Sequence, residues 1–127
     1  MSQITKNILM IKPSSFGFNN DTSGDNYFQK QINHLSQSEI RLKAVEEFEN
    51  MCSILKKNGI NIIVFENDEN KKLTDDVFPN NWISFHGNKY VIHSMYAKSR
   101  RGEKNKSFIK TLSTHNFNYT LLNDYTN

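Results

Sequence analysis

The chain has 127 residues, of which 36% are hydrophobic and 12% aromatic, and its formal net charge is +3. This length corresponds to about one domain, with a core that leans on phenylalanine and tyrosine. The positive charge is dispersed except near Lys98 to Lys106, which argues against a nucleic-acid-binding protein. The N-terminal apolar run, Ile8 to Ile11, is too short for a signal peptide or a membrane span. A single cysteine, Cys52, excludes an internal disulfide and fits a reducing compartment, so we expect a cytoplasmic protein without a membrane partner.

The first half of the chain is predicted to fold as strand, helix, strand. Ile8 to Ile11, which Lys12-Pro13 stops, has the length of a buried strand. Ser36 to Glu39 has the Ser-x-x-Glu form of a capping box, so a helix begins there, and Gly59 is predicted to end it in a left-handed conformation. The apolar stripe of that helix is predicted to consist of Ile40, Ala44, Phe48, Met51 and Leu55. Ile60 to Phe65 is the most strand-like run, and a crossover of this length favours parallel pairing with the first strand.

Two polar connections flank these elements. Ser14 to Asn33 carries four aromatic residues, which need partners, so we expect this segment to fold over the body of the protein and line a cleft. Glu66 to Asp76 contains five acidic residues but no glycine for the sharp turn of a calcium loop. We therefore expect a solvated loop there.

The stretch Val77 to His86 anchors the second half. Pro79 fixes its own φ and biases Phe78 toward an extended conformation, so a stiff loop leads into a strand. The pattern from Trp82 to His93 predicts two short strands joined by a turn at Gly87-Asn88. A short helix from Ser107 to Thr114 and a strand from Tyr119 to Leu122 follow, which gives the order strand, strand, helix, strand.

Two groups of polar side chains in this half are candidate binding residues. Asn80 and Asn81 lie at a strand mouth, where they could hold a ligand, although asparagine is also a common turn residue and the pattern favours that reading. Arg100 and Arg101 could bind phosphate or carboxylate, although a solvated basic loop is the commoner arrangement.

No self-sufficient catalytic centre is visible in the sequence. The four histidines, His34, His86, His93 and His115, have no metal-ligand spacing backed by cysteine or carboxylate, so we expect no metal and no cofactor. There is no glycine-rich phosphate loop and no Gly-x-Ser-x-Gly elbow. Cys52 lies beside the apolar stripe of its helix and is read as a packing residue rather than a nucleophile.

Several short motifs in order give the chain a family resemblance. The pieces are Met10-Ile11-Lys12-Pro13, Phe16-Gly17-Phe18-Asn19, Asn26-Tyr27-Phe28-Gln29, Val64-Phe65, Val77-Phe78-Pro79-Asn80-Asn81-Trp82 and Arg100-Arg101. Together they resemble the N-terminal part of the amidinotransferase-related, citrulline-hydrolase-like family of guanidine-modifying penteins. The resemblance covers most of residues 7 to 124, and Phe-Pro-Asn-Asn-Trp is its most specific piece.

The resemblance implies an α/β fold that is part of an α/β-propeller, with about two of five strand-strand-helix-strand modules at residues 7–66 and 77–124. It implies an enzyme that acts on the guanidino or ureido group of citrulline or arginine-like substrates. The substrate-binding residues it suggests are Asn19, Phe78, Asn80, Asn81, Arg100 and Arg101. Arginine-deiminase relatives place an Asp where this chain has Asn81, and a carboxamide suits a neutral ureido group, which needs both a donor and an acceptor.

Such enzymes use a C-terminal cysteine and a mid-chain histidine, and no residue of this chain matches either motif. We therefore expect a truncated amidinohydrolase-like protein, residues 1–127 forming the N-terminal part of one domain, that is inactive alone. Its uncovered strand edges and apolar residues such as Trp82 would promote self-association. The alternative is a small non-enzymatic binding module that uses Arg100 and Arg101 for an anionic partner.

Overall fold

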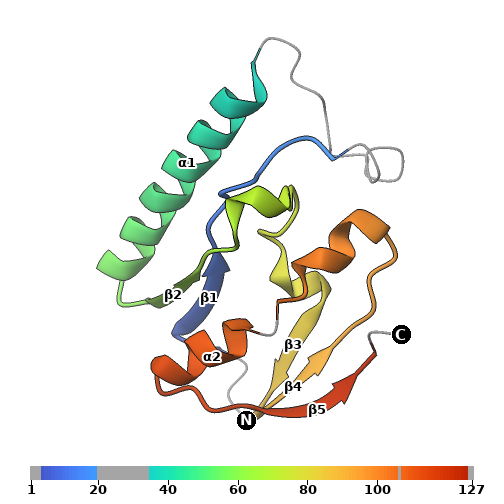
Figure 1. The fold of residues 1–127 in the computed structure, drawn as a ribbon. Coiled ribbons are helices and arrows are strands. Elements are labelled where there is room, and N and C mark those ends of the chain that lie inside the picture. The colour runs from blue at the N-terminus through green and yellow to red at the C-terminus, as the bar shows by residue number, and fades with distance from the viewer. Residues whose placement is uncertain (1–3, 20–34, 106, 126–127) are drawn as a thin grey trace.

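The computed structural model describes residues 4–19, 35–105 and 107–125, and these contain two small sheets and two α-helices (Figure 1). The first sheet pairs β1 (Asn7–Ile11) with β2 (Asn61–Phe65) in parallel, and α1 (Gln37–Lys57) connects them. The second sheet has the strand order β3 (Ile83–His86), β4 (Lys89–Ile92), β5 (Thr120–Asp124), with α2 (Ser107–Thr114) between β4 and β5. The predicted α/β class, the element order and the parallel pairing of the first sheet are confirmed.

Local sequence signals account for the ends of α1. Ser36 is the N-cap, where its Oγ accepts from the backbone N–H of Glu39 at 3.3 Å and its own N–H donates to Glu39 Oε2 at 2.7 Å, so the predicted capping box is formed. At the other end Gly59 has a φ of 78°, a value that a side chain would strain, as expected for a helix terminator.

The buried face of α1 differs from the predicted stripe at one position. Phe48 and Cys52 are buried and pack with Ile62 of β2, with Leu55 partly buried against them. Met51, predicted to be buried, is 46% exposed, because it lies one helix position from Cys52 and therefore about 100° around the axis. The packing role of Cys52 is consistent with its burial.

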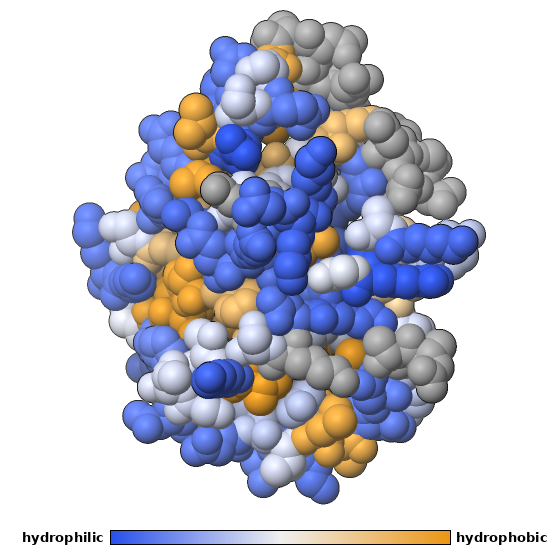
Figure 2. Space-filling view, viewed as in Figure 1, coloured by the Kyte–Doolittle hydropathy of each residue, from blue (hydrophilic) through white to orange (hydrophobic). Residues whose placement is uncertain are grey.

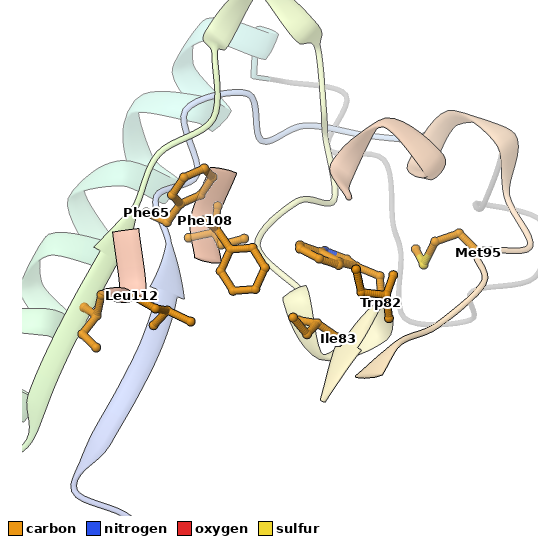
Figure 3. Packing of buried hydrophobic residues seen from close by; sticks show 9 residues of the cluster. Phe65, Trp82, Ile83, Met95, Phe108 and Leu112 are labelled. Atoms are coloured by element: carbon orange, nitrogen blue, oxygen red, sulfur yellow. The ribbon is translucent and has the colours of Figure 1, made fainter. Parts of the chain in front are cut away.

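The main core joins the two sheets. Alternate residues of β2, Ile63 and Phe65, face away from α1 and meet Trp82 and Phe108 of the second half. Figure 3 shows the Trp82 indole with Phe108 on one side and Met95 on the other. The rings of Trp82 and Phe108 meet edge to face, with centroids 5.1 Å apart and planes at 88°. The predicted exposure of Trp82 is wrong, because α2 covers it and leaves it 1% exposed.

Apolar side chains remain on the surface at the edge of the second sheet that β5 forms. Leu121 and Leu122 of β5 are 48% and 54% exposed. The face drawn in Figure 2 is mainly hydrophilic, with separate hydrophobic patches, one of them toward the lower end of the molecule where Figure 1 shows β5. In the part of the chain that the structure describes, no helix is both long enough and apolar enough to cross a membrane. The predicted covering role of Tyr27 and Phe28 lies outside the described residues.

Replacing Phe108 by alanine should unfold the junction between the two sheets. Phe108 is 1% exposed and its ring contacts Phe65, Trp82 and Phe85. The expected loss is about 3–5 kcal/mol of the free energy of unfolding, measured by urea denaturation. Tyr96→Ala, at a side chain that is 94% exposed, is the control and should change stability by less than about 0.5 kcal/mol. Equal effects of the two variants would contradict the shared core.

Candidate functional site

The candidate site residues lie in three loops that meet next to the main core. Asn19 follows β1, the segment from Asp75 to Asn81 lies between β2 and β3, and Arg100 belongs to η3 (Lys98–Glu103), which follows β4. Because β1 and β2 are parallel, the loops at their carboxyl ends leave the sheet at the same edge. Figure 1 shows η3, in orange, near the loops that follow β1 and β2.

Arg100 is the hub of the site. Its Nε and Nη2 donate to the two carboxylate oxygens of Glu103 at 2.9 Å each, a bidentate pair, and Nη2 also donates to the carbonyl oxygen of Asp75 at 3.1 Å. Its Nη1 donates to Oδ1 of Asn81 at 2.9 Å. The Arg100 side chain is only 14% exposed and that of Glu103 only 1%, so most of this network lies out of water.

A second contact ties the loop after β1 to this hub. Asn19 is buried, and its Nδ2 donates to Oδ2 of Asp75 at 2.6 Å. The same Asp75 oxygen lies 4.0 Å from Nε of Arg100. Asn19, Asp75, Arg100 and Asn81 therefore form one continuous polar chain across the three loops.

A buried carboxyl group lies beside this chain. Asp76 is 1% exposed; its Oδ2 accepts from Nδ2 of Asn67 at 3.0 Å, and Asn105 Nδ2 in turn donates to Asn67 Oδ1 at 3.2 Å. Among the described residues, Asp76 Oδ1 has no hydrogen-bond partner. Burial raises the pKa of Asp76 to about 6, the negative charge of Glu103 adds to the rise, and the bond from Asn67 opposes it. Burial also raises the pKa of Glu103, although Arg100 opposes that shift.

Two loop predictions are corrected by these contacts. The segment ending at Asp76 was expected to be solvated, but Leu73 and Asp76 are buried. The basic segment was also expected to be solvated, but Arg100 is enclosed by partners from its own helix and from the segment Asp75 to Asn81. The sequence offered one overlooked signal, the three-residue spacing of Arg100 and Glu103, which suits an ion pair on one helical face.

The remaining predicted residues lie at the surface around Asn81. Phe78 is 48% exposed, and Asn80 and Asn81 are exposed in the short helix η2 (Pro79–Asn81). Trp82 follows directly and points into the core. The Phe-Pro-Asn-Asn-Trp motif therefore exposes its phenylalanine and its two asparagines and buries its tryptophan. Arg101 is separate from this group, because its Nε donates to the carbonyl oxygen of Met95 at 3.1 Å and braces the turn before η3.

Arg100 and Arg101 are the residues that the alternative function, a non-enzymatic binding module, would use to hold an anionic partner. Arg100 makes four hydrogen bonds within the protein, and Arg101 is bonded to backbone carbonyl groups. In the ranges that the structure describes, no group of three or more His, Cys, Asp and Glu side chains is arranged to hold a metal ion. The site is thus a hydrogen-bonding surface of carboxamides backed by a buried ion pair.

Comparison with known proteins assigns the chain to a class of enzymes and then to a family. Its mixed helices and strands in two sheets are consistent with an α/β fold, the fold class of the guanidine-modifying pentein superfamily. Residues 12–127 match the family model described as N,N dimethylarginine dimethylhydrolase, eukaryotic. Because this match spans most of the chain, the protein belongs to the dimethylarginine dimethylhydrolase family, whose parent activity is hydrolysis of an arginine derivative. No curated protein and no solved structure matched the chain.

The buried carboxyl group makes a testable prediction about pH. The folded-state pKa of Asp76, about 6, is higher than the ordinary aspartate value of 3.8. The folded state therefore binds more protons than the unfolded state between these two pH values, and stability falls as pH rises through this window. Charging Asp76 should cost roughly 2–3 kcal/mol of the free energy of unfolding. Asp76→Asn should therefore be more stable than wild type at pH 7.5 and show a flatter pH profile between pH 4 and pH 6.

Chemical denaturation at several pH values measures this effect. Glu46→Gln, which removes a carboxylate from the exposed side of α1, is the matched control and should keep the wild-type profile. An Asp76→Asn profile parallel to that of wild type would show that Asp76 is not the group whose charging is unfavourable.

Proposed function

We propose that the chain forms the substrate-side half of a hydrolase site that acts on citrulline or on an arginine-like compound. In this proposal Phe78, Asn80 and Asn81 face the ureido or guanidino end of the substrate, while Asn19, Arg100 and Arg101 support the loops around it. The family match supports the compound class, and the convergence of three loops on Arg100 supports the location.

The orientation of the Asn81 carboxamide is the observation that carries the choice of substrate. An arginine guanidinium can only donate hydrogen bonds, so the atom of Asn81 that faces Arg100 must be its oxygen. The Nδ2 group is therefore directed away from Arg100, and among the described residues it donates to no acceptor. A free N–H donor matches the carbonyl oxygen of a ureido group, whereas a guanidinium offers only further donors. This favours the finer assignment to a citrulline-hydrolase-like protein.

The order of the helices and strands supports the further proposal that the chain contains two pentein modules. Strands β3 and β4, helix α2 and strand β5 follow the order of one pentein module, and β1, α1 and β2 supply most of another. We place these units, residues 7–66 and 77–124, as two of the five modules of an α/β-propeller. The buried free thiol of Cys52 fits a cytoplasmic location for this protein.

Binding of citrulline by the 127-residue chain tests the proposal. Perturbation of backbone amide NMR signals near Asn81 should appear with citrulline and should be weaker with arginine. Asn81→Ala should weaken citrulline binding by about 1–3 kcal/mol, because one directed hydrogen bond is lost. Asn81→Asp should reverse the preference toward arginine, because a carboxylate accepts from a guanidinium.

Asn88→Ala supplies the matched control for this experiment. Asn88 is an exposed carboxamide in the turn between β3 and β4, and its removal should leave binding unchanged. The proposal is wrong if neither compound perturbs the signals near Asn81, or if Asn81→Ala and Asn88→Ala have equal effects.

Turnover by the isolated chain should be undetectable with citrulline, arginine or dimethylarginine as substrate. Cys52 is the only thiol of the 127 residues, it is buried between α1 and β2, and its pKa is raised by burial, so it is held as an unreactive thiol. Release of ammonia or dimethylamine is the measurement, with Cys52→Ser as the control for thiol chemistry. Activity that Cys52→Ser abolishes would overturn the assignment of Cys52 as a packing residue.

A further inference from the structure

Two histidines of the second sheet direct their Nε2 atoms at one position. Ile83 and Ile92 face the main core, so Ser84 and His86, which alternate with the core residues along β3, project from the opposite face. His93 follows β4. Ser84 Oγ lies 2.9 Å from His86 Nε2 and 2.8 Å from His93 Nε2. Two imidazole nitrogens from neighbouring strands therefore converge on a single hydroxyl group.

The backbone fixes this convergence. The His93 N–H donates to the carbonyl oxygen of Trp82 at 2.7 Å, which continues the β3–β4 ladder one step beyond the pair of Ile83 and Ile92. His93 is thereby held across from the start of β3, beside Ser84. His86 is exposed and His93 half-buried, so both rings retain room to rotate on a fixed backbone.

The Ser84 hydroxyl can satisfy both imidazole rings, and this fixes which ring holds its proton on Nε2. A serine hydroxyl carries one proton, so it can donate to one imidazole and must accept from the other. Two neutral histidines must then adopt opposite tautomers to satisfy the same oxygen. A divalent cation can take the place of the hydroxyl group as the shared partner, because both rings can hold their proton on Nδ1 and turn the Nε2 lone pair toward the ion.

We propose that His86 and His93 chelate a divalent transition-metal ion of the Zn²⁺ or Cu²⁺ class on this face of the sheet. Imidazole nitrogen suits these ions and does not suit Mg²⁺ or Ca²⁺, which require oxygen ligands. Coordination requires both rings to turn until their Nε2 atoms lie at the usual distance of about 2.0–2.1 Å from a common ion, and water completes the coordination. Ser84 Oγ lies at the position that the ion takes and moves aside.

The electrostatic surroundings set the strength of the site. Lys89 pairs with His86 across the β3–β4 hairpin and is exposed, so its charge opposes a cation but its side chain can turn away into water. Two protein ligands and one nearby cation define a site of moderate affinity. The ion crosslinks β3 to β4 directly after Trp82, and so braces the strand that follows Asn80 and Asn81.

Calorimetric titration of the intact 127-residue chain with Zn²⁺, and separately with Cu²⁺, tests this site. We expect one ion per chain, a higher thermal midpoint with Zn²⁺, and no heat of binding with Mg²⁺. His86→Ala and His93→Ala should each weaken binding at least about tenfold, because a chelate becomes a single imidazole ligand. His115→Ala, which removes an exposed histidine after α2, is the matched control and should retain wild-type affinity.

Two further variants keep the test decisive. Ser84→Ala should retain the ion within about threefold, because the hydroxyl is displaced rather than required. His86→Gln keeps a polar side chain at the strand end, so its loss of binding separates chelation from any effect on folding. The proposal is overturned if no ion binds, if binding survives both histidine variants, or if His115→Ala weakens it as much as they do.

Discussion

The bidentate pair between Arg100 and Glu103 is the interaction on which the candidate site depends. Glu103 is 1% exposed, so its charge would be costly to bury without the guanidinium. The pair also fixes the plane of the Arg100 guanidinium, and its other donors then hold Asn81 and the carbonyl oxygen of Asp75. Removal of either partner would leave a buried charge unpaired and release three loops at once. A buried ion pair thus serves here to define geometry, in a protein with only a small apolar core.

Trp82 connects this polar network to the core. It follows Asn81 directly, and its indole packs edge to face on Phe108 beneath the site. Because Pro79 restricts the backbone on one side and Trp82 is anchored on the other, the exposed side chains between them have few conformations available. The same residue accepts the backbone hydrogen bond from His93, so the candidate hydrolase surface and the histidine pair share one support.

Local patterns predicted the elements well, whereas long-range polar contacts escaped prediction. The Ser36 capping box, the glycine that ends α1 and the hairpin turn at Gly87 all depend on residues close in sequence, and each is formed. The burial of Asp76 and of Glu103 could not be read in the same way, because acidic residues among Asn, Lys and Thr have the composition of a solvated loop. Their partners come from other segments, and only the folded chain brings them together.

A double-mutant cycle between Arg100 and Asn81 tests the central claim most directly. Arg100→Lys keeps a positive charge near Glu103 but lacks the guanidinium geometry, and Asn81→Ala removes the acceptor. If Arg100 orients the Asn81 carboxamide, the two substitutions should be coupled by about 1 kcal/mol in the free energy of unfolding. Effects that add to within about 0.3 kcal/mol would show that the contact does not orient Asn81, and the argument for a ureido substrate would fail with it.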